Sequence, residues 1–419
     1  MIRKNRVHGS SLLYVLMLIL IISTLLSAYI LLNARQRSWL DRIYGAELAR
    51  ENMYAGMSLL LAEPFHLGES RAYSLFDSAY DSAYLQTSVW GTLGLVQASG
   101  FHADEMSQQW ALIGQVLSDK RKASLFLDAQ KQPLVIVGKT ALRGTIYLPA
   151  TGVKKGSVGR RKYEGEKLIY GTRKSSSEQM LKVDYSLWSH IQDTLLSIQA
   201  DTVQEEYYYI RKVSHHQPWE DDEFEIRSQH SLIVDQSSFS GKCQIVTSGD
   251  IIIEADSELD HTLLYGRRIY IEKGFKGNCQ AFALERIEVA PEVSLTYPSV
   301  LAVLKGNKEP AHIHLNHHTE LEGALLYHGS LIGGEKHRED YVWVDSTSVL
   351  WGLADIPYQF ELEGTVYGHV HTKQFLLRTP GAIYKNYLLD VTLDASKLDP
   401  SYAAPFIDPQ VPSKIIQWL

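Results

Sequence analysis

The chain has 419 residues, of which 45% are hydrophobic and 21% are charged, a composition that indicates a folded protein rather than a disordered one. Its net charge of -7 supplies no basic surface for nucleic acid, so we expect no nucleic-acid partner. The two cysteines are too few for a disulfide scaffold.

An apolar run without charges extends from Leu12 to Leu32 and is long enough to span a bilayer. A secretory signal has a shorter apolar region and normally ends in a small-x-small cleavage site. We therefore interpret the run as a retained transmembrane helix in contact with membrane lipid, preceded by a cytoplasmic N-terminus at residues 1–11. Basic residues flank both ends of the run, so charge counting alone does not orient it. Because a large carboxyl domain can be exported regardless, we expect a single-pass protein of the inner (cell) membrane with a periplasmic or otherwise extracytoplasmic C-terminal domain.

Residues 33–63 continue the helical pattern beyond the apolar run. Their apolar side chains fall on one stripe, with spacings of 4, 3, 7, 4 and 3 residues: Trp39, Ile43, Ala46, Met53, Met57 and Leu60. Pro64 ends the pattern. We predict one long helix, half in the membrane and half amphipathic, whose stripe packs on its own domain or, alternatively, on a partner.

Residues 64–236 contain short alternating segments and turns, which predict a β-rich, antiparallel domain. The expected strands are Trp90 to Ala98, Trp110 to Leu117, Leu125 to Asp128, Leu134 to Gly138, Gly144 to Leu148 and Lys167 to Gly171. A helix is expected around Val183 to Ile198, an exposed loop from Gly152 to Arg161, and the junction with the next domain within Gln204 to Arg227.

Residues 237–378 predict a β-solenoid. Every sixth residue from Phe239 to Ser299 is apolar or small, and so is a second column two residues later, from Gly241 to Leu301. Two inward positions followed by an outward corner describe one face of such a fold. Three faces close a triangular coil of about 18 residues. The fold class is therefore mainly β, and one strand pattern is used three times: Asp250 to Glu254, Arg268 to Glu272 and Arg286 to Ala290.

The six-residue pattern is interrupted at Lys305 to Ala311 and at Gly333 to Asp340, and it resumes after each interruption. Such interruptions are typical of loops inserted between the strands of a solenoid. The proline-rich segment at residues 379–419 is expected to be a C-terminal capping tail that covers the edge of the last coil.

Candidate chemical motifs do not support a site. Val137-Gly138-Lys139-Thr140 lacks the earlier glycine of a phosphate-binding loop. Adjacent carboxylates and histidine pairs are more often a solvated face than a glycosidase or zinc site: Asp221 and Asp222; Glu361 and Glu363; His312, His314, His317 and His318; His369 and His371. We predict no catalytic, cofactor-binding or metal-binding residues, no cofactor and no enzyme activity.

The two cysteines share a corner position in the repeat. Cys243 and Cys279 are 36 residues apart, which is two coils, with His261 between them. Two strand spacings separate their Cα atoms by about 9 to 10 Å, too far for a disulfide. Two free thiols are expected.

The N-terminal region resembles the minor-pilin and pseudopilin-like families. The resemblance rests on a basic residue and glycine before the membrane helix, Arg6-Val7-His8-Gly9-Ser10-Ser11, and on the continuation Ala49-Arg50-Glu51-Asn52-Met53-Tyr54-Ala55-Gly56-Met57. Major pilins carry a glutamate five residues after the cleaved glycine, where this chain has Tyr14, and some minor members also lack it. The resemblance implies a helix that extends from the membrane into the periplasm and an assembly role.

The C-terminal half resembles the bactofilin-like, polymer-forming β-helix family through its repeated Ile-x-Ile/Val units, the coil from Gly277 to Ala283, and Tyr297-Pro298-Ser299. That resemblance implies triangular coils and self-association. Together the patterns predict a non-enzymatic, membrane-anchored structural or assembly subunit of an envelope or pilus-like apparatus, with protein partners and a solenoid scaffold. Two alternatives are a β-helix protein that binds or acts on polysaccharide and a cytoplasmic scaffold anchored at the inner membrane.

Overall fold

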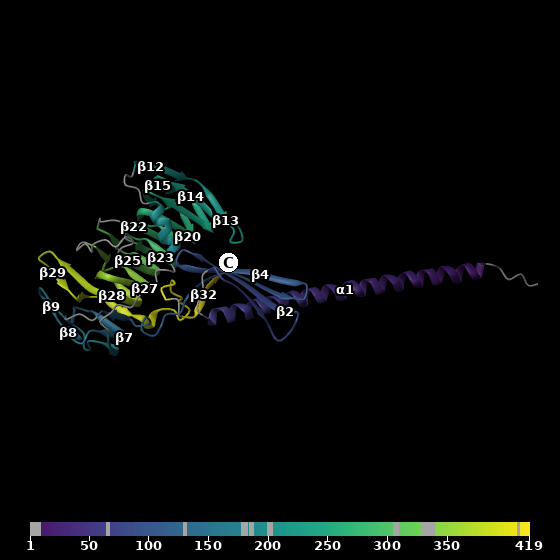
Figure 1. The fold of residues 1–419 in the computed structure, drawn as a ribbon, viewed down its shortest axis with the longest axis horizontal. Helices are drawn as coiled ribbons and strands as arrows, with labels where there is room; N and C mark the ends of the chain where they lie inside the picture. Colours follow the sequence, from purple (N-terminus) through teal and green to yellow (C-terminus); the bar gives the residue numbers. More distant parts are fainter. Residues whose placement is uncertain are drawn as a thin grey trace, which may run out of the picture. The chain divides into compact units, whose positions relative to one another are not determined.

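The structure is a computed structural model that describes residues 10–63, 68–128, 132–176, 183, 188–198, 204–304, 310–328, 340–408 and 411–419. It is mainly β with one long N-terminal helix (Figure 1). The chain divides into two compact units. Unit 1 comprises Met1–Leu59, Ser70–Leu85 and Ala98–Gln109, and unit 2 comprises Leu60–Glu69, Gln86–Gln97 and Trp110–Leu419.

Helix α1 (Ser10–Ala62) is 53 residues long, which confirms the continuous helix expected from the sequence. It is the one helix in the described part of the chain that is long and apolar enough to cross a membrane. The large apolar side chains of its first half are exposed along the whole circumference, for example Leu16, Leu20 and Ile30. This half therefore has the surface that a lipid-facing span requires.

A sheet follows the helix in the order β1-β2-β3-β4-β32. Its strands are β1 (Ser70–Ser74), β2 (Asp81–Trp90), β3 (Leu93–His102), β4 (Glu105–Gln115) and β32 (Ser413–Trp418). Two residues join β2 to β3, and two residues join β3 to β4. Neighbouring strands with such short connections run antiparallel, as predicted for this region, because a parallel pair needs a long crossover.

The other elements before residue 204 are short: β5 (Leu125–Leu127), β6 (Leu134–Val137), β7 (Ala141–Leu148), β8 (Val153–Lys155), β9 (Ser157–Val158), β10 (Arg161–Lys162), β11 (Tyr170–Ser175) and α2 (Ser189–Ser197). The segment expected to be an exposed loop, Gly152 to Arg161, thus contains short strands, of which β8 pairs in parallel with β6. The helix expected around Val183 to Ile198 is present as α2 from Ser189 to Ser197, and residues 184–187 of the prediction lie outside the described residues.

Strands fill most of the chain after residue 204: β12 (Gln204–Arg211), β13 (Ser214–Gln217), β14 (Phe224–Ser228), β15 (His230–Asp235), β16 (Ser238–Gly241), β17 (Cys243–Thr247), β18 (Asp250–Ile253), β19 (Glu258–Asp260), β20 (Thr262–Ile271), β21 (Lys276–Gly277), β22 (Cys279–Val289), β23 (Ser294–Leu304), β24 (His312–Leu315), β25 (Glu320–His328), β26 (Tyr341–Val344), β27 (Val349–Leu362), β28 (Thr365–Thr379), β29 (Ala382–Lys385), β30 (Tyr387–Leu389) and β31 (Thr392–Asp394), followed by the short helix η2 (Ala395–Lys397).

Most of these strands form a parallel stack, whereas β29 pairs antiparallel with β28, β13, β16 and β19 form a separate three-stranded sheet, and β30 forms another with β6 and β8. One line of pairing joins β12, β15, β18, β20, β22, β24, β26, β27 and β28. A second joins β14, β17, β20, β22, β23, β25, β27, β28, β5, β7 and β11. A third joins β21, β23, β25, β27, β28, β31, β7 and β11. Long strands such as β20 and β27 take part in more than one line, so the arrangement is compatible with a β-solenoid.

The predicted register is confirmed where the sequence pattern is regular. Asp250 pairs with Arg268, and Arg268 pairs with Arg286, so successive partners are 18 residues apart. Ile251, Ile269 and Ile287 consequently form one column, and each is 0% exposed. The interruptions predicted near residues 305–311 and 333–340 fall largely outside the described residues. The pairing nevertheless continues across them, from Arg286 to His312 and from His312 to Tyr341.

The parallel stack is built from two separate parts of the chain. Strand β5 pairs in parallel with β28 and with β7, and β31 also pairs in parallel with β7. Figure 1 shows the result at one end of the stack, where the yellow β28 lies near the blue β7. The antiparallel arrangement predicted for all of residues 64–236 is therefore wrong for β5, β7 and β11, and also for β12 to β15 at residues 204–235, because both segments contribute strands to parallel pairs.

The C-terminal tail was expected to cover the edge of the last coil. Its strands β29 and β31 pair with β28, as does β5 from the earlier part of the chain, whereas its last strand β32 pairs antiparallel with β4. The predicted junction, Gln204 to Arg227, forms β12 to β14, which pair with β15 to β17. The domain boundaries given above remain predictions.

Candidate functional site

The second half of α1 has one side buried, and all of it up to Leu59 lies in unit 1. Met53, Met57 and Leu60 of the predicted stripe are buried, but Trp39 and Ile43 are 62% and 49% exposed. The stripe therefore does not pack on its own domain at its first three positions, and packing there on a partner stays a prediction. The buried side instead continues through small and polar residues, which an apolar pattern does not register: Gly45, Ala49, Asn52 and Gly56.

Glycines bring the helix into backbone contact with the sheet. A Cβ atom added to Gly100 of β3 would lie 2.1 Å from the carbonyl oxygen of Ala49 and 2.3 Å from the backbone nitrogen of Met53. A Cβ atom added to Gly56 of α1 would lie 2.3 Å from the Cβ atom of Ala83 in β2. No larger side chain fits at either position without moving the helix away, so these glycines fix the helix closely against β2 and β3.

A polar cluster links the same elements. The Asn52 side-chain amide donates to Asp81 Oδ1 at 2.8 Å and to the Phe101 carbonyl oxygen at 2.7 Å. His102 Nδ1 lies 2.7 Å from Asp81 Oδ1. These hydrogen bonds, first from His102 and then from Asn52, lower the pKa of the Asp81 carboxyl from its usual 3.8 to about 2.

The lowered pKa of Asp81 predicts acid sensitivity of unit 1. A carboxylate whose pKa is depressed by folding stabilises the fold above its unfolded pKa and loses that contribution as the pH falls. For Asp81 the loss is expected between pH 3.8 and about 2. Asp81→Asn should lower the unfolding temperature at neutral pH and flatten its dependence on pH in this window, measured on the full chain in detergent. Asp104→Asn, in the exposed turn of the same unit, is the matched control; an equal response from both variants would contradict the assignment.

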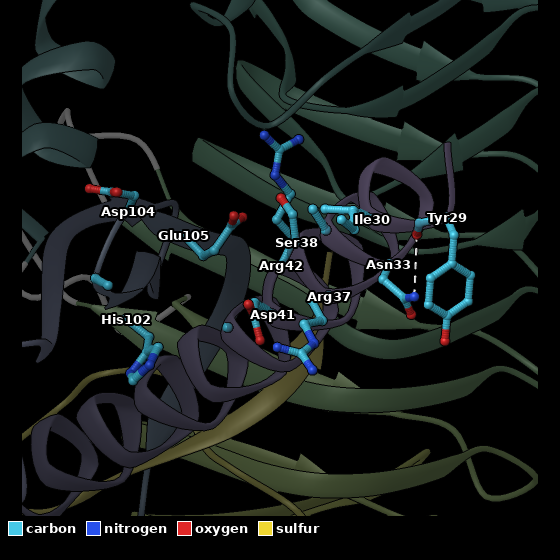
Figure 2. A pocket seen from close by; sticks show the side chains of 13 residues that line it. Tyr29, Ile30, Asn33, Arg37, Ser38, Asp41, Arg42, His102, Asp104 and Glu105 are labelled. Carbon is cyan, nitrogen blue, oxygen red and sulfur yellow. Dashed lines mark hydrogen bonds between the residues drawn. The ribbon is translucent and has the colours of Figure 1, made fainter. Parts of the chain in front are cut away.

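A recess of about 990 Å³ lies between α1 and the turn that joins β3 to β4 (Figure 2). Its helical side is lined by Tyr29, Ile30, Asn33, Ala34, Arg37, Ser38, Asp41, Arg42 and Gly45, and its other side by His102, Ala103, Asp104 and Glu105. Charged groups of both signs therefore gather directly after the apolar run. The recess can form ion pairs and hydrogen bonds with a partner or with lipid headgroups at the membrane boundary.

The same part of α1 exposes a compact apolar surface. Its members lie within two helical turns: Trp39 (62% exposed), Leu40 (51%), Ile43 (49%) and Tyr44 (67%). Single exposed apolar residues are ordinary on a protein surface, but a contiguous group marks an interaction site with protein or membrane.

The histidine pairs identified in the sequence are in polar networks on the parallel stack. His312 and His314 lie on one side of β24, with ring centroids 4.7 Å apart. Burial, reinforced by the nearby Arg286, lowers the pKa of His312 to about 4. His314 Nδ1 lies 3.1 Å from Glu288 Oε2, and His317 Nδ1 lies 2.9 Å from Asp345 Oδ1. Within the described ranges, no group of three or more His, Cys, Asp or Glu side chains is arranged to hold a metal ion.

The two carboxylate pairs identified in the sequence lie in different environments. Asp221 and Asp222 are exposed, whereas Glu361 is buried beside Arg378, with 3.4 Å between Oε2 and Nε. Burial raises the pKa of Glu361 and also that of Glu363, where Glu361 adds to the effect. The segment that resembles part of a phosphate-binding loop is a turn between β6 and β7, in which the Lys139 backbone nitrogen donates to Asp390. It is followed by a strand and not by the helix that a phosphate-binding loop requires.

A buried ionic cluster was not identified from the sequence. Arg121 Nη1 donates to Asp355 Oδ2 at 3.0 Å, and His371 Nδ1 lies 3.1 Å from the same oxygen. His371 Nε2 lies 2.9 Å from the Arg121 carbonyl oxygen. Arg121 and Asp355 are far apart in the sequence, and no local motif connects them. The cluster joins the segment that leads into β5 to β27 and β28, so its place indicates a role in holding the parallel stack together.

Cys243 and Cys279 are buried thiols, and burial raises the pKa of Cys279 to about 12. The register confirms that two coils separate them. Thr262, not His261, pairs with Cys279 between the two coils, because β20 begins at Thr262. His261 is displaced by its left-handed backbone, with φ of 59°.

No protein-family model and no curated protein matches the sequence. Among solved structures, the chain is similar to the competence-associated pilin ComZ from Thermus thermophilus. The two are 8% identical, the match covers 91% of this chain and 97% of that chain, and the TM-score is 0.21. A TM-score at this level does not establish a shared fold, and the bactofilin-like resemblance stays a prediction.

Proposed function

We propose that the protein is a non-enzymatic, single-pass membrane subunit of an envelope or pilus-like apparatus, with a structural or assembly role. In this proposal the apolar half of α1 anchors the chain in the inner membrane, and unit 2 lies in the periplasm or otherwise outside the cytoplasm. The parallel stack, taken as a triangular β-solenoid with coils of about 18 residues, serves as the interaction scaffold.

The continuity of α1 carries the proposal. One uninterrupted helix is apolar and fully exposed in its first half, whereas its second half is held against β2 and β3 by Gly56, Gly100 and Asn52. A rigid rod that joins a membrane span to a folded unit transmits position between them without a flexible linker. This is the helix that the pilin-like resemblance of the N-terminal region implies.

The exposed surface formed by Trp39, Leu40, Ile43 and Tyr44 is the expected contact with protein partners. Met53 and Met57 are unsuitable probes of such a contact, because they are buried in unit 1 and their replacement would disturb the fold. Trp39→Ser, Ile43→Ser and Tyr44→Ser in one chain should reduce co-purification of envelope partners with the tagged, membrane-extracted protein. The unfolding temperature should stay unchanged, because these side chains are exposed.

The matched control replaces three apolar residues outside α1 that are at least 64% exposed with serine: Phe76, Tyr80 and Ile383. This control should retain every partner. If the α1 variant also retains every partner while the control loses some, α1 is not the assembly surface and the proposal is wrong.

A polysaccharide-binding or polysaccharide-acting protein is the second candidate. Its support is the charged flank of the parallel stack, where Arg268 donates to both carboxylate oxygens of Asp250 at 2.8 Å and further charges lie in register, among them Arg286. The third candidate, a cytoplasmic scaffold, differs in orientation. Protease added outside spheroplasts should digest unit 2 if it is extracytoplasmic and leave it intact if it is cytoplasmic.

A further inference from the structure

A separate cavity of about 320 Å³ lies on the parallel stack, entirely within unit 2. It is lined by three aromatic residues, two carboxylates, a hydroxyl and an aliphatic side chain: Tyr297, Trp351, Tyr402, Glu322, Asp399, Ser401 and Leu398. The volume is at the lower end of the range for small-molecule sites, so the cavity suits a small group rather than an extended chain.

The aromatic walls are held in place by hydrogen bonds from their polar ends. Tyr402 donates through its hydroxyl to the Gly323 carbonyl oxygen at 2.8 Å. The Tyr297 hydroxyl donates to the Ala403 carbonyl oxygen at 2.9 Å and accepts from the Ala403 backbone nitrogen at 3.1 Å. Trp351 Nε1 donates to Glu320 at 3.0 Å. The rings are therefore positioned before a ligand arrives, which reduces the entropic cost of binding.

A column of glycines makes room for Tyr402. Gly323 pairs with Gly352, and Gly352 pairs with Gly368, in successive strands of the stack. Gly323 and Gly352 have φ of 143° and 139°, in the left-handed region that favours glycine. A Cβ atom on Gly352 would lie 1.9 Å from the Gly323 carbonyl oxygen and 3.0 Å from the Tyr402 ring. The close fit of this ring is thus a property of the stacked backbone.

The charges of the cavity select the ligand. Glu322 is fixed by the Tyr297 backbone nitrogen, which donates to its Oε2 at 3.3 Å. Hydrogen bonds from Ser401 lower the pKa of Asp399, and the positive charge of Lys414 adds to this effect. Lys414, whose Nζ donates to the Pro400 carbonyl oxygen, lines the neighbouring recess, and the described residues lining this cavity include no basic side chain. Anions are therefore disfavoured.

We propose that this cavity binds an organic ammonium group, held against the faces of Tyr297, Trp351 and Tyr402 and neutralised by Glu322 and Asp399. Aromatic faces attract cations through their quadrupoles, and a carboxylate adds direct charge pairing. A neutral sugar could also stack on these rings and donate hydroxyl hydrogen bonds to the two carboxylates, but it brings no positive charge to pair with them or with the aromatic faces. The binding group belongs to a trimethylammonium compound such as choline or to the primary amine of a lysine side chain, and the test distinguishes these sources.

The test titrates the full-length protein in phosphatidylglycerol nanodiscs, which contain neither amine nor sugar headgroups. The probes are choline, its uncharged isostere 3,3-dimethylbutan-1-ol, Nα-acetyl-lysine methylamide, which keeps its side-chain ammonium group, and N-acetylglucosamine. One ammonium probe should bind with a Kd on the order of 1 mM or below, and the isostere and the sugar at least about tenfold more weakly. Whichever ammonium probe binds more tightly identifies the source. Equal binding of choline and its isostere, tighter binding of the sugar, or no binding of either ammonium probe would overturn the proposal.

Two variants assign binding to this cavity. Glu322→Gln keeps the shape of the side chain and should weaken the affinity for the ammonium probe by about tenfold. Trp351→Leu should weaken this affinity by about fivefold. Glu258→Gln, at an exposed position in β19 of the same unit, is the matched control and should leave binding unchanged. Unfolding temperatures of all three variants are measured alongside. Unchanged affinity in a folded Glu322→Gln variant would show that the ammonium binds elsewhere. The ammonium-binding proposal does not depend on the assembly role proposed above, so either can fail without the other.

Discussion

Replacing Ile269 with aspartate is expected to lower the free energy of unfolding by about 4 kcal/mol. Ile269 is 0% exposed and lies between Ile251 and Ile287 in the inward column of the parallel stack. Adjacent coils are separated by about 4.8 Å, so a carboxylate at this position has apolar side chains above and below it. It must either remain charged without a partner or bind a proton, and both cost stability.

The matched control is Ile252→Asp, which makes the same change on the outward side of the same strand. Ile252 is only partly buried and pairs with Tyr270, so water can reach the new carboxylate. The measurement is the apparent unfolding temperature of the full chain in detergent at one scan rate, because unfolding of such a chain can be irreversible. Ile252→Asp should cost less than half as much as Ile269→Asp. Equal effects would contradict the alternation of inward and outward residues.

This alternation was predictable from the sequence because it is local. A strand repeats its inward side every two residues, and a regular coil returns to the same side after a fixed number of residues, so Ile251, Ile269 and Ile287 could be aligned without a structure. The contribution of β5 and β7 to the stack could not be predicted in this way. Their pairing with β28 and β31 depends on where the chain returns after a long excursion, and local periodicity does not record that.

In the candidate sites, too, local features were predictable from the sequence and contacts between distant segments were not. The long helix was predictable from an unbroken pattern, but its buried side depends on Gly45, Gly56 and Asn52, which a search for apolar residues passes over. The ammonium cavity joins Tyr297, Trp351 and Tyr402, which come from different strands and from the C-terminal segment. One local signal was available, since Gly323, Gly352 and Gly368 interrupt strand-like segments and indicate a close backbone approach.

The second large expected effect concerns the buried ionic cluster of Arg121, Asp355 and His371. This cluster links the segment that leads into β5 to strands β27 and β28 of the parallel stack. Arg121 and Asp355 are each 3% exposed at their side chains, and His371 is 0% exposed. Asp355→Asn keeps the size of the side chain but leaves the Arg121 guanidinium in a buried position without this carboxylate. Removing one partner of a buried ion pair costs about 3 to 5 kcal/mol, because the remaining charge has lost its solvation and its counter-charge. The coils at residues 125–175 should become the first part of the stack to open.

Proteolysis and unfolding of the full chain in detergent test this expectation together. Asp355→Asn should lower the unfolding temperature and speed cleavage within residues 125–175. Glu292→Gln, which breaks the exposed ion pair with Lys273, should cost at most about 1 kcal/mol and serves as the control. Adding Arg121→Met to Asp355→Asn should recover part of the lost stability, because the double variant removes the buried charge that has lost the Asp355 carboxylate and keeps an apolar side chain of similar length. If the double variant is less stable than Asp355→Asn, the guanidinium stabilises this joint through contacts other than its ion pair, and the charge argument fails.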